Sequence, residues 1–240
     1  MAFIGWAAVG VHNNPRHGEQ ETRHGVAAFA LASLTGSRNS LRMAQAEQPK
    51  AKRVTGSAVP SAWLGEVERV LITQQQISRR VRQLARQIER DFRGRDLAVV
   101  SLLSGTVMFL ADLIRHLSLP LRLDFMGVSS YRDGTESREL VFTKELKMEV
   151  LGRDVLVVDD ILDTGKTLKA VLHKLRGLGP RRIKVCVLLE KEARRVENVR
   201  ADYVGFQIPD LFVIGYGLDF AERYRNLPFI AVLKNPEALS

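Results

Sequence analysis

Three aspartates close together in the sequence are the strongest candidates for chemistry in this chain. Asp159 and Asp160 directly follow the apolar run 155–158, and Asp163 stands three residues further on. Carboxylates clustered in this way can accept hydrogen bonds from sugar hydroxyls, bind a divalent cation or act as a general base. The aliphatic run before them predicts that the cluster lies at the end of a buried strand.

The residues that follow the acids predict an anion-binding loop. The segment from Asp163 to Thr167 leads into a helix predicted over 165–179. Backbone N–H groups at the start of a helix form a cradle for a phosphate. Thr164 and Thr167 add hydroxyl donors, and Gly165 lets the backbone approach a ligand closely. Acids beside such a cradle indicate a ligand with both hydroxyls and phosphate, a cation, or both.

Three known motifs match this segment in part. A P-loop requires a glycine five residues before Gly165, where Asp160 stands, so a P-loop nucleoside triphosphatase is excluded. The Asp-Asp-x-x-Asp spacing also matches the metal motif of prenyl synthases, but those motifs lie on helices of all-α proteins and this one follows a strand. The third possibility is a phosphoribosyl-diphosphate site, in which the loop holds the 5′-phosphate and the acids hold the ribose hydroxyls.

The elements around the acids follow an α/β pattern. Strands are predicted over 67–73, 97–103, 121–131, 154–160 and 182–190, helices over 74–94, 106–117 and 165–179, and closing segments over 203–209 and 212–219. This alternation predicts a parallel sheet that is covered on both faces and binds ligands at the carboxyl ends of its strands. Polar residues follow four of the strands, which predicts one site along that edge.

Composition sets the outer limits of the interpretation. The chain has 240 residues, of which 45% are hydrophobic, and no run approaches the roughly 18 apolar residues of a membrane span. The single cysteine, Cys186, excludes an internal disulfide, so we expect a cytoplasmic protein without a membrane segment. A net charge of +9 fits anionic ligands. Residues 1–64 are expected to be a disordered or spurious N-terminal extension before a domain over 65–240.

The acidic segment resembles the signature of type I phosphoribosyltransferases, and the chain resembles their hypoxanthine-guanine branch from about Val67 to Asn235. The motifs that carry this resemblance are LLSGTVMFLADL, DFMGVSSY, VVDDILDTGKTL, LLEKEARR and IPDLFVIGYGLDFAERYRNLP. The resemblance implies the type I phosphoribosyltransferase fold, a mostly parallel central sheet flanked by helices with a small C-terminal hood over the base site. It also implies transfer of 5-phosphoribosyl from phosphoribosyl diphosphate to hypoxanthine or guanine, giving IMP or GMP plus diphosphate in purine salvage.

The same resemblance implies roles for the acids and the loop. Asp163 would be the catalytic base that handles the proton on purine N7. Asp159 and Asp160 would hold the ribose hydroxyls and, together with Asp219, would bind Mg²⁺. The residues implied for the 5′-phosphate are Thr164, Gly165, Lys166 and Thr167.

Further residues match the base site and the diphosphate site of the family. Lys191 would donate to the 6-oxo oxygen of the purine, Phe212 would stack on its ring, and the backbone of Val213 would contact its exocyclic edge. The residues implied for the diphosphate and for the loop that closes over the site are Ser104, Gly105, Ser130, Tyr131 and Arg225.

One position departs from the family pattern. The diphosphate loop usually reads Leu-Lys/Arg-Gly, but here it is Leu103-Ser104-Gly105. The peptide bond before the middle residue is often cis in the family, and serine keeps that geometry possible. The missing cation predicts weaker binding of phosphoribosyl diphosphate or a different subunit contact, and Arg132 in the closing loop is a candidate for the missing charge.

Two other functions stay open at this point. A regulator could use the same fold to sense phosphoribosyl diphosphate and contact nucleic acid through its basic tail. An enzyme of this fold could also act on another base, such as xanthine or uracil. The presence of Asp163, Lys191 and Phe212 favours the 6-oxopurine enzyme, and the tail lacks a helix-turn-helix pattern, so no specific nucleic-acid partner is expected. The resemblance also implies a homodimer or homotetramer.

Overall fold

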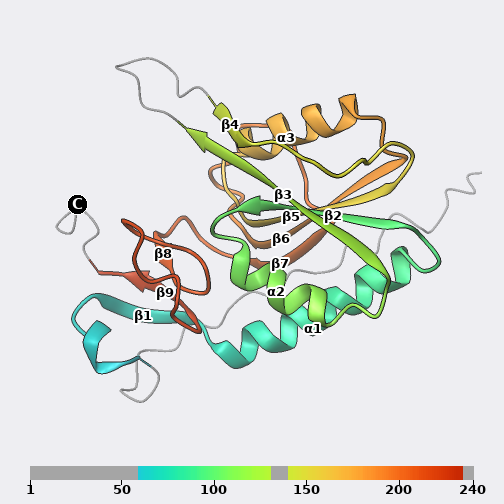
Figure 1. The fold of residues 1–240 in the computed structure, drawn as a ribbon. Coiled ribbons are helices and arrows are strands. Elements are labelled where there is room, and N and C mark those ends of the chain that lie inside the picture. Colours follow the sequence, from blue (N-terminus) through green and yellow to red (C-terminus); the bar gives the residue numbers. More distant parts are fainter. Residues whose placement is uncertain (1–58, 131–139, 235–240) are drawn as a thin grey trace, which may run out of the picture. The chain divides into compact units, whose positions relative to one another are not determined.

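The computed structural model describes residues 59–130 and 140–234, which form an α/β domain (Figure 1). The central sheet contains β2 (Leu97–Leu103), β3 (Leu121–Ser130), β4 (Leu140–Lys144), β5 (Asp154–Leu162), β6 (Arg182–Glu190) and β7 (Tyr203–Gln207). The α-helices of the described ranges are α1 (Gln74–Asp91), α2 (Val107–Arg115) and α3 (Lys166–Gly177). The predicted fold class, a mostly parallel sheet flanked by helices, is confirmed.

The strand order of the central sheet brings the predicted reactive segments together. The order is β4-β3-β2-β5-β6-β7, and every neighbouring pair is parallel except β3 and β4. β5 lies between β2 and β6, with Val158 opposite both Ser101 and Cys186. Because parallel strands end at the same edge of a sheet, the residues that follow β2, β5 and β6 are neighbours there.

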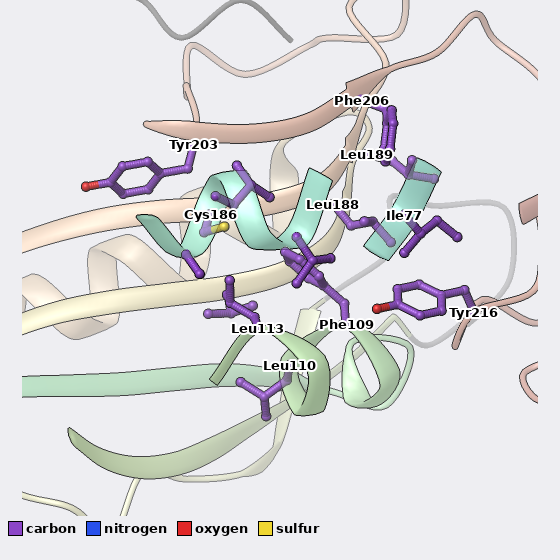
Figure 2. Close-up of a cluster of buried hydrophobic side chains, with 14 of the residues drawn as sticks. Ile77, Phe109, Leu110, Leu113, Cys186, Leu188, Leu189, Tyr203, Phe206 and Tyr216 are labelled. Carbon is purple, nitrogen blue, oxygen red and sulfur yellow. The ribbon is translucent and has the colours of Figure 1, made fainter. Parts of the chain in front are cut away.

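Alternate residues of β5 face two layers of the hydrophobic core. Leu156 and Val158 pack in a cluster with α1 and α2, whereas Val155 and Val157 pack in a cluster with α3. Figure 2 shows the first cluster, in which side chains of α2 point toward those of β6. The single cysteine, Cys186, is buried there, and burial raises the pKa of its thiol. With both faces covered, β5 is a rigid support for the acids at its end.

Helix α1 fixes one edge of this sheet. It begins at a capping box, in which the Gln76 backbone N–H donates to Thr73 Oγ1 and the Thr73 N–H donates to Gln76 Oε1. Arg80, which lies on the buried face of the helix, donates to the carbonyls of Gly205 and Val204 over 2.8 and 2.7 Å. The helix thereby holds β7 in place. None of the helices in the described ranges is long and apolar enough to cross a membrane.

A second, antiparallel sheet corresponds to the predicted hood. It contains β1 (Val67–Ile72), β9 (Ile230–Leu233) and β8 (Val213–Ile214), in that order. Two of its strands come from the C-terminal part of the chain, as the prediction has it, but β1 comes from the start of the domain. Pairing with β1 is a contact between distant parts of the chain, which sequence periodicity does not reveal.

Packing into the domain begins ahead of the predicted boundary at residue 65. Val59 is buried, and Trp63, at the end of the short helix η1 (Ser61–Trp63), packs against Tyr224 with ring centroids 4.9 Å apart. The segment 59–64 therefore contacts the hood, although the sequence analysis assigns it to the extension. The remaining residues of that extension, 1–58, lie outside the described residues.

Candidate active site

The two adjacent acids, Asp159 and Asp160, lie inside β5, close to its carboxyl end. The strand was predicted to stop at Asp160 but continues to Leu162, because its pairing with β6 extends that far. Asp159 is only 8% exposed and accepts a hydrogen bond at 3.0 Å from the N–H of Asp160. Asp160 in turn accepts one at 2.7 Å from the N–H of Ile161. Backbone contacts thus fix both carboxylates.

Burial makes this pair of carboxyl groups hard to ionise. Burial raises the pKa of Asp159 well above its ordinary value, and the neighbouring charge of Asp160 adds to that rise. Burial also raises the pKa of Asp160, while the Ile161 N–H and, more weakly, Arg225 oppose the rise. The protein alone therefore does not stabilise two negative charges here, and a divalent cation or the hydrogen bonds of sugar hydroxyls would stabilise the ionised pair.

The predicted anion loop is held from behind by the segment after β6. Gly165 has φ +85°, and a Cβ there would lie 2.6 Å from Val199 Cγ2, so both the turn and the packing require glycine. The Thr164 carbonyl accepts hydrogen bonds at 3.0 Å from the N–H groups of Val196 and Glu197. The loop therefore enters α3 with a defined shape, and the helix N-terminus that follows favours an anion.

The predicted diphosphate loop touches the acids directly. The Leu103–Ser104 peptide bond is cis, as the resemblance implies. A Cβ on Gly105 would lie 1.8 Å from Asp160 Oδ2, and one on Gly217 would lie 2.0 Å from the Gly105 carbonyl oxygen. Two glycines therefore allow the backbone after β2, the acid of β5 and the hood segment to approach one another.

The two charged residues expected near the diphosphate form a pair. Arg225 Nη2 lies 2.9 Å from Asp219 Oδ1, and Arg225 Nη1 donates to the Gly217 carbonyl over 2.7 Å. Since Gly217 packs on Gly105, the guanidinium belongs to the same site as Asp160. The described residues contain no group of three or more side chains that could hold a metal ion by themselves. A cation here would thus need ligand atoms from a substrate as well.

The side chains expected around the base form a second charged group. Lys191 follows β6, is almost fully buried, and its Nζ lies 3.5 Å from Asp210 Oδ1. Arg194 Nε lies 3.5 Å from Asp163 Oδ1. The backbone N–H of Lys191 donates to the Leu162 carbonyl at 3.0 Å, which places this group beside the end of β5.

The hood supplies the aromatic residue expected at the base. Phe212 is 45% exposed and meets the ring of Phe220 edge to face, with centroids 5.4 Å apart. Val213 is buried in β8. An exposed aromatic face of this kind can stack on a planar ligand.

Not every predicted site residue can be placed. Ser130 ends β3, whereas Tyr131 and Arg132 lie outside the described residues. Conversely, Asp210 and Arg194 were not predicted as site residues, although both stand in motifs that carry the family resemblance. Their position next to Lys191 in the fold is what distinguishes them.

The comparisons with known proteins agree on one family. The family described as "Phosphoribosyl transferase domain" matches residues 70–221. The hypoxanthine-guanine phosphoribosyltransferase of Bacillus subtilis (strain 168) is 42% identical over 170 residues, which are 70% of this chain and 94% of that protein. The enzyme of the same name from Staphylococcus aureus (strain Mu50) is 43% identical over 176 residues, 73% of this chain and 98% of that protein.

Other relatives extend this picture. The bifunctional protein TilS/HprT of Listeria monocytogenes is 43% identical over 176 residues, and the chain spans 27% of its length. A crystal structure of a hypoxanthine phosphoribosyltransferase from Staphylococcus aureus superposes with a TM-score of 0.71 at 42% identity, covering 76% of this chain and 99% of that one. A hypoxanthine-guanine-xanthine phosphoribosyltransferase superposes with a TM-score of 0.66 at 38% identity, covering 71% and 99%.

Proposed function

Because the chain belongs to the phosphoribosyltransferase family, in its hypoxanthine-guanine branch, we propose that the residues of the candidate active site act together in one purine-salvage reaction. The enzyme transfers 5-phosphoribosyl from phosphoribosyl diphosphate to hypoxanthine or guanine, giving IMP or GMP plus diphosphate. One observation carries the assignment of roles to residues. The acids of β5 and the buried Lys191 after β6 meet at one edge of the sheet, where a sugar and a base can each find a matching set of groups.

The acids and the loop after β5 bind the ribose 5-phosphate part of the substrate. Asp159 and Asp160 accept hydrogen bonds from the 2′- and 3′-hydroxyls, and the segment 163–167 holds the 5′-phosphate at the start of α3. As the bond from C1′ to diphosphate breaks, positive charge develops on the ribose ring. Two fixed carboxylates beside the ring stabilise that charge more than they stabilise the ground state.

Mg²⁺ fits the site as a partner of substrate oxygens. Burial raises the pKa values of Asp159 and Asp160, so a bound cation would stabilise their ionised form, whereas Asp219 already has Arg225 as its counter-ion. Asp159, Asp160 and Asp219 do not form one metal-binding group in the described residues, so the metal would contact these acids only together with oxygen atoms of phosphoribosyl diphosphate. When bound, it neutralises charge on the departing diphosphate.

The residues after β5 and β6 bind the purine. Asp163 takes the proton from N7 while the ring nitrogen N9 forms its bond to C1′. The electron pair of the N7–H bond stays on the ring, and diphosphate leaves with the electron pair of the broken C1′–O bond. Lys191 donates a hydrogen bond to the 6-oxo oxygen. A 6-amino purine has a donor at this position and cannot accept that hydrogen bond. Phe212 stacks on the ring and the backbone of Val213 meets its far edge.

Arg225 places a cation close to the diphosphate loop, in which Ser104 stands where the family has lysine or arginine. Its guanidinium donates to the Gly217 carbonyl, and Gly217 packs on Gly105, next to Ser104. A planar guanidinium binds phosphate oxygens through two hydrogen bonds. We retain the expectation that phosphoribosyl diphosphate binds more weakly than with a lysine or arginine at position 104.

The enzyme works as a homodimer or homotetramer in the cytoplasm under this proposal. Apolar side chains at the end of β2 and the start of α2 support an interface, since Leu103, Val107 and Met108 are 39%, 43% and 41% exposed. Sedimentation velocity tests this part of the proposal, and a monomer at micromolar concentration would contradict it.

A substrate panel tests the function itself. Purified protein receives phosphoribosyl diphosphate and Mg²⁺ with hypoxanthine, guanine, xanthine, adenine or uracil, and nucleotide formation is followed by absorbance. We expect turnover of hypoxanthine and guanine. Turnover of uracil alone would contradict the base assignment. Binding of phosphoribosyl diphosphate without turnover of any base would support the regulator that the sequence analysis left open.

A further inference from the structure

Four side chains of alternating charge form a row that begins at Lys191 and ends at Asp163, the two side chains that are assigned to the purine. Lys191 Nζ lies 3.5 Å from Asp210 Oδ1, and Arg194 Nη1 lies 3.7 Å from the same oxygen. A different nitrogen of the Arg194 guanidinium, Nε, lies 3.5 Å from Asp163 Oδ1. A single carboxylate oxygen of Asp210 thus lies between two cations.

Burial makes this contact important for Lys191. Its side chain is only 8% exposed, so its ammonium has lost most of its water, and a buried ammonium is costly unless it has hydrogen-bond acceptors. Within the described ranges, Asp210 Oδ1 serves as such an acceptor. The side chain of Asp210 itself is half exposed and stays in contact with solvent.

The backbone fixes Asp210 relative to the end of β6. The N–H of Ile208 donates to the Glu190 carbonyl at 3.0 Å, directly before Lys191. The N–H of Leu211 donates to the Pro209 carbonyl at 2.8 Å, which turns the chain at this point. Asp210 is therefore held in place by the main chain on both sides.

From this geometry we propose that Asp210 is a positioning residue for purine binding, an inference that rests on the proposed function. It holds the Lys191 ammonium where the 6-oxo oxygen will bind. Asp210 also shares the Arg194 guanidinium with Asp163, so that Arg194 does not form an ion pair with Asp163 alone. Without the charge of Asp210, two cations face one acid, and Asp163 is drawn into a tighter ion pair and away from purine N7.

The test compares the Michaelis constants for the two substrates in Asp210→Asn. This variant keeps the shape of the side chain and removes its charge. We expect the KM for hypoxanthine to rise by about tenfold, as for the loss of one charge-assisted hydrogen bond. The KM for phosphoribosyl diphosphate is expected to stay within about twofold, because the affected groups face the base and not the ribose.

Two further variants serve as controls. Asp210→Glu restores the charge and is expected to recover most of the affinity for hypoxanthine. Glu145→Gln removes one partner of an exposed ion pair, Lys174 to Glu145 at 2.7 Å, outside the site, and is expected to leave both constants unchanged.

Each other outcome would overturn the inference. It fails if Asp210→Asn behaves like Glu145→Gln, if both Michaelis constants rise together, or if Asp210→Glu is as impaired as Asp210→Asn. An unsubstituted chain that forms no nucleotide from any 6-oxopurine would overturn both this inference and the proposed function.

Discussion

Replacing Gly105 by alanine tests whether Asp160 belongs to the substrate site or only to the strand. The added methyl carbon would lie 1.8 Å from Asp160 Oδ2 and 3.0 Å from its Cγ. A comfortable contact requires about 3.4 Å, so the oxygen must retreat from 1.8 to 3.4 Å, a move of about 1.6 Å. The backbone itself does not resist, because φ at Gly105 lies outside the left-handed region.

The cost of this move falls on activity more than on stability. The atom that must yield is the end of a side chain, so we expect the free energy of unfolding to fall by no more than about 1–3 kcal/mol, the usual cost of a small overpacking. Misplacement of a substrate-holding group by about 1 Å costs roughly 100-fold in rate. We therefore expect kcat/KM for phosphoribosyl diphosphate to fall at least about 100-fold, which corresponds to roughly 2.7 kcal/mol of transition-state stabilisation.

Steady-state kinetics with varied phosphoribosyl diphosphate at saturating hypoxanthine measures this effect. Gly177→Ala is a matched control, because a Cβ there meets nothing within 4 Å. It is expected to keep full activity and to gain up to about 1 kcal/mol of stability at the end of α3. A Gly105→Ala enzyme that unfolds like the unsubstituted chain and keeps its kcat/KM would refute the assignment of Asp160 to the ribose.

Three further predictions concern single side chains. Asp163→Asn is expected to lower kcat by about 10²–10⁴-fold in a steady-state assay, since an amide cannot take the N7 proton, and a variant with near-normal kcat would exclude Asp163 as the base. In the absence of Mg²⁺ and substrate, the raised pKa of Asp159 means that the folded chain keeps protons which the unfolded chain has lost, so the free energy of unfolding falls as the pH rises toward that pKa. Asp159→Asn should weaken this fall and stabilise the ligand-free chain near neutral pH. Denaturant unfolding from about pH 4 to about pH 8 measures the free energy of unfolding of both chains, and the same pH dependence in both would contradict the prediction. Tyr216→Phe removes the hydroxyl that donates to Asp112 Oδ2 over 2.7 Å and should lower the free energy of unfolding by about 1–2 kcal/mol, whereas an unchanged denaturation midpoint would show that this bond adds nothing.

The parts of the fold that local pattern determines could be predicted from the sequence. The aliphatic run before Asp159 fixes a strand, and the spacing of apolar residues fixes α1, because both depend on which faces of one element are buried. The helix α3 was predicted over 165–179 and observed over Lys166–Gly177. The edge strand β4 was not predicted, since its half-exposed residues become a strand only through pairing with β3.

The candidate site divides in the same way. The residue pattern indicated the acids and the anion loop, and the family resemblance implied Lys191 and Arg225, because the motifs that hold them are contiguous. The sequence did not indicate the contact of Gly105 with Asp160, or the ion pairs of Asp210, because these join segments that only the tertiary fold brings together. Spacing along the chain carries no information about such approaches.

Direct competition between two bases tests the central claim that this site transfers phosphoribosyl to 6-oxopurines. Equal concentrations of hypoxanthine and adenine are incubated with enzyme, Mg²⁺ and limiting phosphoribosyl diphosphate, and the nucleotides are separated by chromatography. The role proposed for the buried Lys191 predicts IMP in excess over AMP by at least about 100-fold. Comparable amounts of IMP and AMP, or no nucleotide at all, would contradict the account.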